Sequence, residues 1–401
     1  MAGPAVSPPP PPPPAPAYQP IPINSPEPGL KVAATVPGEP QINQLFRTVM
    51  MHKGSDLHLK SNLPGMMRLR GVIQKMNTPA LSHETLEKLI FPIMGPKDKK
   101  VFDETGGADF AHVVGTDEAR FRVNVLKQRG RLALVARLVT QNIPSFEKLF
   151  LPPQIEKLCH YEMGMVLLAG VTGSGKSTTI ASMLEYMNQR EALHILTIED
   201  PIEFVFTDKM SVVNQREVYL DVSDWHTALK HAVREDPDVI LVGEMRDAET
   251  FEAGINAAET GHVVFGTVHA STAASTISRI LDLFPPNMHH AVRQSLGFNL
   301  KAVVAQKLVP SIKPGVQRVP TNEIMIVNPT IRDLILKNQD HKLIDAIRIG
   351  FLEGMVDFTE NLRQLVERGD IDKSTALEFA PNPEQLKMAL KGIKVSAQGI
   401  L

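Results

Sequence analysis

The sequence contains a single cysteine, Cys159, among its 401 residues. One thiol cannot form an internal disulfide, which excludes a disulfide-stabilised secreted scaffold and is typical of a reducing compartment. The sequence also lacks an apolar run of the roughly 18 residues that a membrane-spanning helix needs. Its N-terminus lacks the basic and apolar segments of a signal peptide. We therefore expect a soluble cytoplasmic protein that is nevertheless able to dock on a membrane complex.

Aromatic residues make up only 5% of the sequence, and the formal net charge is only -2. The chain therefore has no overall basic field that would attract nucleic acid, and its basic and aromatic residues are not interleaved as in single-strand-binding grooves. We expect no nucleic-acid partner. Cysteines and carboxylates do not cluster at metal-ligand spacing either, which argues against a structural metal site.

Proline, in contrast, is abundant and is concentrated in residues 1–40, with an unbroken run from Pro8 to Pro14. Such a segment favours extended polyproline II and cannot build a core. Two interpretations remain open: a disordered tail, or a docking site for a proline-binding module.

An α+β domain is predicted over residues 41–145, with order beginning near Gln41. "SDLHLK" alternates polar and apolar residues as a half-buried strand does, and "MMRLRGVIQKM" reads as two strands with a turn near Gly71. Ser82 is a plausible N-cap for a helix with an apolar face. "ADFAHVV" and the stretch 119–139 complete an antiparallel sheet.

The pattern changes after a proline-containing linker with a short helix, residues 146–164. "MVLLAG", "HILTIED", "DVILVGE" and "HVVFGTVH" are continuous apolar runs, as expected for strands buried on both faces of a parallel sheet. Helical stretches alternate with them, which predicts an α/β fold with both sheet faces covered over residues 165–320. Residues 321–401 carry apolar residues at helical spacing and are expected to be mainly helical.

A phosphate-binding loop follows the first of these strands. "GVTGSGKST" matches G-x-x-x-x-G-K-[ST], with a buried strand before it and a helix after it. The glycines allow backbone N–H groups to turn inward, Lys176 brings positive charge to the outer phosphates of ATP, and Ser177 offers a hydroxyl to Mg²⁺. The predicted nucleotide-binding residues are Gly170, Val171, Thr172, Gly173, Ser174, Gly175, Lys176, Ser177 and Thr178.

The strand "DVILVGE" ends in Glu244 with no second acid beside it. Nucleotide hydrolysis normally needs one carboxylate for Mg²⁺ and another group for the attacking water. "TIEDPIEF" supplies acids at the end of another strand, where α/β sheets bind their ligands. We expect Glu203, with Asp200 nearby, to help to hold Mg²⁺ through its water shell, which leaves Glu244 to orient or deprotonate the water. Alternatively, Asp200 or Glu199 merely caps the next segment.

Two histidines, His262 and His269, flank the last apolar strand in "GHVVFGTVHAS". A histidine near the γ-phosphate is able to sense it and to relay the nucleotide state. The alternative is that each histidine is satisfied by local hydrogen bonds.

These motifs occur together in one order: "GVTGSGKSTT", "TIEDPIEF", "REDPDVILVGEMRD" and "TGHVVFGTVHAS". The sequence resembles the motor ATPases of type II and type IV secretion and type IV pili, in particular the pilus retraction branch. The resemblance covers about residues 45–395. The long cysteine-rich insert and the large extra N-terminal domain of many assembly ATPases are absent.

The resemblance implies a homohexameric ring whose subunits each hold a PAS-like N-terminal domain and a RecA-like domain, with ATP and Mg²⁺ bound at the subunit edge. It also implies an inner-membrane platform protein of the pilus as partner, and a location at the inner face of that membrane. Arginines of the N-terminal domain become candidate fingers on the γ-phosphate. Those in the matching stretch are Arg120, Arg122 and Arg137; for each the alternative is a surface or strand-pairing role.

Four functional hypotheses follow. The first is a hexameric ATPase for pilus retraction, in support of twitching motility. The second is an assembly or secretion motor, or an accessory retraction partner. The third is a regulatory nucleotide-binding protein, although a pure sensor would not need Lys176, Glu203 and Glu244 together. The fourth is a RecA-like helicase, which the balanced charge disfavours.

Overall fold

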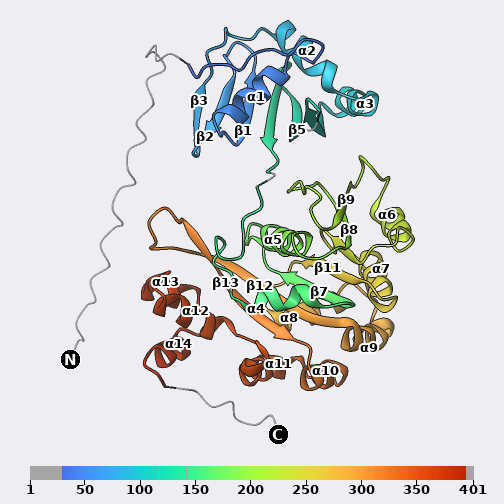
Figure 1. Cartoon of the computed structure of the whole chain (residues 1–401), viewed down its shortest axis with the longest axis vertical. Helices are drawn as coiled ribbons and strands as arrows, with labels where there is room; N and C mark the ends of the chain where they lie inside the picture. The colour runs from blue at the N-terminus through green and yellow to red at the C-terminus, as the bar shows by residue number, and fades with distance from the viewer. Residues whose placement is uncertain (1–28, 117, 141, 394–401) are drawn as a thin grey trace, which may run out of the picture. The chain divides into compact units, whose positions relative to one another are not determined.

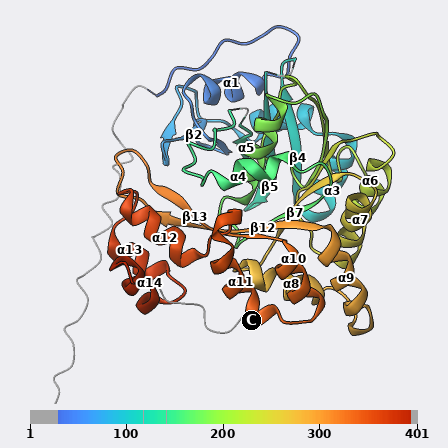
Figure 2. The ribbon, with the colours of Figure 1, turned by 60° about the horizontal axis from the view of Figure 1, so that its bottom comes forward.

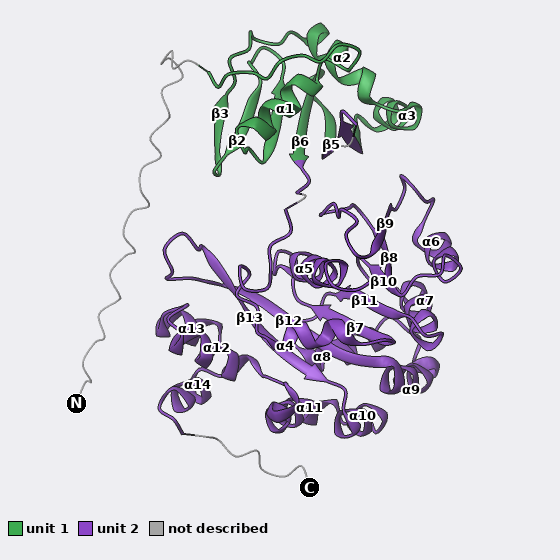
Figure 3. Cartoon of the chain, in the orientation of Figure 1, with its two compact units in different colours: residues 1–109, 123–137 green, residues 110–122, 138–401 purple. Residues whose placement is uncertain are grey.

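The computed structural model describes residues 29–116, 118–140 and 142–393. The chain forms two compact units, coloured separately in Figure 3. Unit 1 contains residues 1–109 and 123–137, and unit 2 contains residues 110–122 and 138–401.

Part of the chain ahead of Gln41, where order was expected to begin, is already paired with the rest of the chain. Leu30 donates its N–H to the Lys75 carbonyl at 3.0 Å and accepts from the Asn77 N–H at 2.8 Å. This pairing covers part of an exposed sheet edge, so the chain is held in place before the expected start at Gln41. The remainder of the predicted tail, residues 1–28, lies outside the described residues.

The N-terminal sheet has six strands in the order β3-β2-β1-β6-β5-β4, and β1 pairs antiparallel with both β2 and β6. Leu57 and Leu59 of β1 are buried, as is Phe46 of α1. The predicted strands are confirmed, and Ser82 caps α2 by accepting from the Thr85 N–H at 3.1 Å. The elements are α1 (Asn43–Met51), β1 (Asp56–Lys60), β2 (Met66–Leu69), β3 (Val72–Lys75), α2 (His83–Ile90), α3 (Pro96–Thr105), β4 (Gly107–Val114), β5 (Ala119–Gln128) and β6 (Arg131–Leu138).

Unit 2 is built on a seven-stranded sheet in the order β13-β12-β7-β11-β10-β8-β9 (Figure 1). All neighbouring pairs are parallel except β12 and β13. The four predicted apolar strands are confirmed and lie side by side. The elements up to the last of them are α4 (Gln154–Lys157), β7 (Gly164–Ala169), α5 (Lys176–Asn188), β8 (His194–Glu199), β9 (Val212–Glu217), α6 (Trp225–Ala232), β10 (Val239–Val242), α7 (Ala248–Glu259) and β11 (Val263–Val268).

Both faces of this sheet are covered, as the continuous apolar runs predicted. Val166 and Leu168 of β7 belong to a core that contains residues of α4 and α5. Met165 and Leu167 of the same strand belong to a second core, with residues of α6, α7 and the helices that follow. Because successive side chains of a strand point to opposite faces, one apolar strand serves two cores.

The mainly helical C-terminal part follows a long hairpin whose second strand runs into it. Its strand β13 (Arg318–Ile326) continues past residue 320, and Gln306 of β12 lies opposite Asn322 of β13. Helices α12, α13 and α14 gather beside each other (Figures 1 and 2), around a third core that includes Val309 and Leu362. The remaining elements are α8 (Ala273–Leu281), α9 (His289–Asn299), β12 (Leu300–Pro310), α10 (Pro329–Leu336), α11 (Leu343–Ile349), α12 (Phe358–Glu367), α13 (Lys373–Phe379) and α14 (Pro383–Leu390).

Candidate functional site

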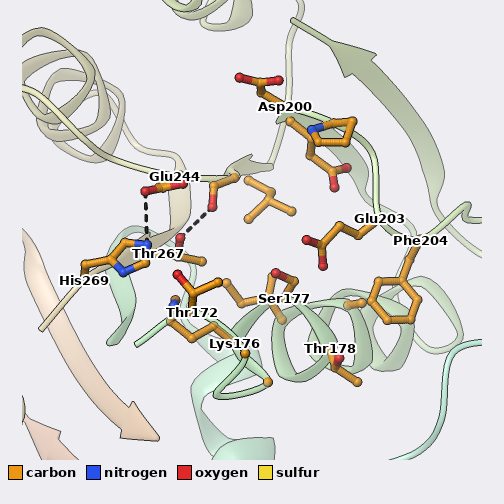
Figure 4. A pocket seen from close by; sticks show the side chains of 18 of the residues that line it. Thr172, Lys176, Ser177, Thr178, Asp200, Glu203, Phe204, Glu244, Thr267 and His269 are labelled. Atoms are coloured by element: carbon orange, nitrogen blue, oxygen red, sulfur yellow. Dashed lines mark hydrogen bonds and ion pairs between the residues drawn. The ribbon is translucent and has the colours of Figure 1, made fainter. Parts of the chain in front are cut away.

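A pocket of about 500 Å³ opens at the carboxyl ends of the parallel strands of unit 2. The segments that follow β7, β8, β10 and β11 all contribute to its wall. Open α/β sheets bind their ligands at this edge. Figure 4 shows the side chains that line it.

The glycine-rich loop forms one side of the pocket, between β7 and α5. Gly170 has φ +155°, and a Cβ added there would lie 2.4 Å from Ser174 Oγ and 2.7 Å from the Gln306 carbonyl oxygen, so only glycine fits. Helix α5 begins at Lys176, and no side chain caps its N-terminus. The first N–H groups of the helix therefore remain available for an anion, as phosphate binding requires.

Lys176 is buried within this loop. Its Nζ donates to the carbonyl oxygens of Gly170 at 2.8 Å and Val171 at 3.1 Å. Burial lowers the pKa of Lys176, while the nearby charges of Glu244 and Glu203 oppose this shift. The ammonium group is thus held where the loop wraps around its ligand, and two carboxylates of the pocket favour its charged form.

Glu244 lies at the opposite side of the pocket from Lys176, between a histidine and an arginine. Its Oε1 is 3.1 Å from Nε2 of His269, and its Oε2 accepts from Arg246 at 2.7 Å. Burial opposes ionisation of Glu244, but the hydrogen bond and charge of Arg246, aided by His269 and Lys176, lower its pKa below the usual range. The group is therefore a carboxylate at neutral pH and is able to accept a proton or a hydrogen bond.

Glu203, Ser177 and Asp200 all line the pocket, but they are not equally placed. In Figure 4 the Glu203 carboxylate points toward Ser177, whereas the Asp200 carboxylate points away from it. Mg²⁺ usually binds through one or two carboxylates together with substrate phosphates rather than in an all-protein cage. No group of three or more His, Cys, Asp or Glu side chains that could hold a metal occurs among the described residues. Ser177 and Glu203 fit such an ion, and Asp200 fits it less well.

The two histidines lie at opposite ends of β11. His269 follows the strand, lines the pocket and contacts Glu244. His262 precedes it, and its Nδ1 lies 2.9 Å from the Ala257 carbonyl and 3.2 Å from Thr260 Oγ1, at the C-terminal end of α7. The structure thus brings only His269 to the pocket, and it gives His262 the local hydrogen bonds of the alternative interpretation.

The three arginines do not line this pocket. Arg120 pairs with Glu217 at 2.9 Å in unit 2, and Arg122 is exposed on β5. Arg137 pairs through Nε with Asp56 at 2.8 Å in unit 1, and 74% of its side chain remains exposed. The Arg137 guanidinium is therefore oriented by a carboxylate yet still open to a partner.

Sequence reasoning missed the remainder of the pocket wall. Phe204 and Trp225 supply aromatic surface, and Arg318 supplies a guanidinium from β13. Phe204 ends the "TIEDPIEF" motif, so its position could have been inferred, but Arg318 lies 142 residues from Lys176 (318 − 176) and no local pattern indicates it. Glu199 also lines the pocket; burial raises its pKa to about 7, against hydrogen bonds from Thr197 and Gln215.

Comparison with known proteins gives a consistent result. The family model described as type II/IV secretion system protein matches residues 32–399. The type IV pilus retraction ATPase PilT of Pseudomonas aeruginosa is 43% identical over 343 residues, which cover 86% of this chain and 99% of PilT. A twitching motility protein of Neisseria gonorrhoeae is 40% identical over 321 residues, covering 80% and 85% of the two chains. A crystal structure of the pilus retraction motor PilT with bound ADP is 42% identical, with a TM-score of 0.79, and the alignment covers 86% and 98%.

Proposed function

This chain belongs to the type II/IV secretion system protein family, and we propose that it is an ATPase that powers the retraction of type IV pili. One observation carries the proposal: the chain aligns with 99% of the length of a pilus retraction ATPase at 43% identity. The pocket supports the enzymatic part, because Lys176 and Glu244 stand on two sides of the same cavity.

In the proposed site, ATP places its phosphates in the glycine-rich loop against Lys176 and the N-terminus of α5. Mg²⁺ would neutralise part of the phosphate charge, and Ser177 and Glu203 would hold it, with Asp200 in a supporting position at the rim. Glu244, ionised at neutral pH, orients or deprotonates the attacking water. His269 contacts Glu244 and is placed to report the state of the nucleotide to the rest of the sheet.

The proposed working form is a homohexameric ring with PAS-like and RecA-like domains in each subunit. An arginine of a neighbouring subunit would complete the site, and Arg137 is the first candidate because most of its side chain is exposed. Arg120 and Arg122 are the other two candidates. The proposed domain limits are 1–40 for the tail, 41–145, a linker at 146–164, 165–320 and 321–401.

The ring would act in the cytoplasm, peripherally associated with the inner membrane through a platform protein of the pilus base. Every helix that the structure describes is too short or too polar to traverse a bilayer.

The direction of the motor is tested by counting surface pili in cells that lack this protein. Retraction predicts excess pili and loss of twitching, because assembly continues unopposed. The full chain should restore the normal number of pili and twitching motility, and the Glu244→Gln variant should restore neither. Glu252→Gln, which changes an exposed glutamate on α7, is the matched control and should complement fully. Loss of pili would instead favour an assembly motor, and an unchanged count would favour an accessory or regulatory role.

A further inference from the structure

Gln306 is a buried amide beneath the phosphate-binding loop. It lies on β12, next to β7 in the sheet, and is 2% exposed. Its Nε2 donates to the Ser174 carbonyl at 2.8 Å, and its Oε1 accepts from Thr179 Oγ1 at 2.9 Å. One side chain therefore joins the loop to the first turn of α5.

The hydrogen bonds continue from Gln306 toward the C-terminal helices. Asn322, directly opposite on β13, donates from Nδ2 to Gln306 Oε1 at 3.0 Å. The Asn322 backbone N–H donates to Asn361 Oδ1 of α12 at 2.9 Å, and Thr321 Oγ1 donates to the same oxygen at 3.1 Å. All of these residues are buried. A continuous polar chain thus runs through an otherwise apolar interior, from the loop to α12.

The bond to Ser174 controls the peptide group that follows it. In a trans peptide the C=O and N–H point in opposite directions. Because the Ser174 carbonyl is held by Gln306, the Gly175 N–H is turned away from Gln306, to the other side of the loop backbone. A phosphate loop needs its N–H groups inward-facing before the ligand arrives, since reorienting them on binding would lower affinity.

We propose that Gln306 is a positioning residue for the phosphate-binding loop and that, through Asn322, it couples the geometry of the loop to helix α12. The proposal rests on nucleotide binding by this loop, as proposed above. An amide suits the position because one end must donate and the other must accept twice. A carboxylate of the same shape would lose the donor and would place an oxygen against the Ser174 carbonyl.

The positioning role is tested by the affinity of the full-length protein for a fluorescent ADP analogue between pH 5.5 and pH 8. At pH 8 we expect Gln306→Glu to bind at least 10-fold more weakly than the unaltered protein. The deficit should shrink as the pH falls, because a buried carboxyl group that takes up a proton regains a donor. Gln306→Met, which has no titrating group, should weaken binding by a factor that stays the same at every pH.

Gln317→Glu, in the exposed part of the same hairpin, is the matched control and should follow the unaltered protein throughout. Unaltered affinity of Gln306→Glu at pH 8, or a deficit that does not change with pH, would overturn the positioning role. Failure of the unaltered protein to bind the analogue would instead contradict the proposed nucleotide site itself.

The coupling to α12 is tested with a double-mutant cycle. Asn361→Ala should weaken ADP-analogue binding 3- to 10-fold although Asn361 does not line the pocket, and Asn361→Asp, which keeps the acceptor, should recover part of that loss. The pair Gln306→Met with Asn361→Ala should bind no more weakly than Gln306→Met alone, since both changes break one chain. If the loss of affinity in the double variant equals the product of the two single losses, the coupling is refuted. A cooperative thermal unfolding transition must first show that each variant is folded.

The same coupling must act in reverse. Addition of ADP should slow amide hydrogen exchange in α12 of the unaltered protein. The Gln306→Met variant should not show this protection, even at an ADP concentration that saturates the variant. Equal protection in both proteins would contradict the role of Gln306 in the coupling.

Discussion

His269 Nε2 lies 3.1 Å from Glu244 Oε1, so residues that follow two neighbouring strands, β11 and β10, meet on the wall of the pocket. The other carboxylate oxygen of Glu244 is taken by Arg246. Glu244 is thus fixed from both sides, with its charge balanced, before any nucleotide arrives. This arrangement leads to the first two predictions.

Replacement of Glu244 by glutamine should abolish hydrolysis while preserving binding. The amide keeps the shape of the side chain but cannot accept a proton from water. We expect the ATPase kcat to fall at least about 100-fold, in line with the loss of a general base, and ADP affinity to change only a few-fold. Steady-state phosphate release measures kcat, and titration with ADP measures the affinity. Hydrolysis at the normal rate would eliminate Glu244 as the base.

Replacement of Arg246 by alanine should shift the acid limb of the pH–rate profile to higher pH. Arg246 lowers the pKa of Glu244, so its removal raises that pKa and a larger fraction of Glu244 is protonated at mildly acidic pH. The measurement is kcat/KM between pH 5 and pH 8. Arg234→Ala, which alters an exposed arginine, is the control. An acid limb that does not move would show that another group sets it.

Replacement of Arg137 by alanine should reduce hydrolysis only in the assembled ring. Arg137 belongs to unit 1 and does not line the pocket of its own chain. We expect the activity of concentrated, ring-forming protein to fall at least about 10-fold, as for a lost arginine finger, with no change in dilute monomers. Asp56→Asn serves as a companion variant, because it removes the orienting carboxylate and leaves the guanidinium. Equal losses in ring and monomer would exclude a role in trans.

Replacement of Glu323 by glutamine should stabilise the protein more at pH 8 than at pH 5. Burial raises the pKa of Glu323 to about 7, against a hydrogen bond from the Ala273 N–H. Because the folded-state pKa exceeds the unfolded one, the stability contribution of the protonated form is complete below about pH 4.5 and is lost as the pH rises toward 7. Glutamine stays neutral throughout. Thermal unfolding at the two pH values measures the difference, and a pH-independent difference would contradict the raised pKa.

Four strands of the ATPase sheet, β7, β8, β10 and β11, were predictable because their sequences carry the signal themselves. "MVLLAG" is apolar at every position and "HVVFGTVH" is apolar at most of its positions, as expected for strands that are buried on both faces. The glycine-rich loop was equally clear, since its spacing and its neighbouring elements are local. The strand β9 was missed because its "VVNQRE" is mostly polar and lies at the sheet edge.

The helical interpretation of the C-terminal part was incomplete for a related reason. β13 includes Thr321, Asn322 and Glu323, three buried polar residues that resemble an exposed segment. Their hydrogen-bond partners come from Gln306, Ala273 and Asn361, none of which is near in sequence. A strand whose polar groups are satisfied at long range has no local signature.

The sequence by itself determined the α/β class of the second domain and the phosphate-binding loop, and it supplied the candidate acids, because each depends on the spacing of neighbouring residues. Only the tertiary structure decided which candidates meet. It placed His269 against Glu244 and left His262 at the far end of the strand. His269 follows the carboxyl end of β11, where the pocket lies, whereas His262 precedes the amino end. It also joined Ser174 to Asn361 through Gln306 and Asn322, a relationship that arises only when the strands pair.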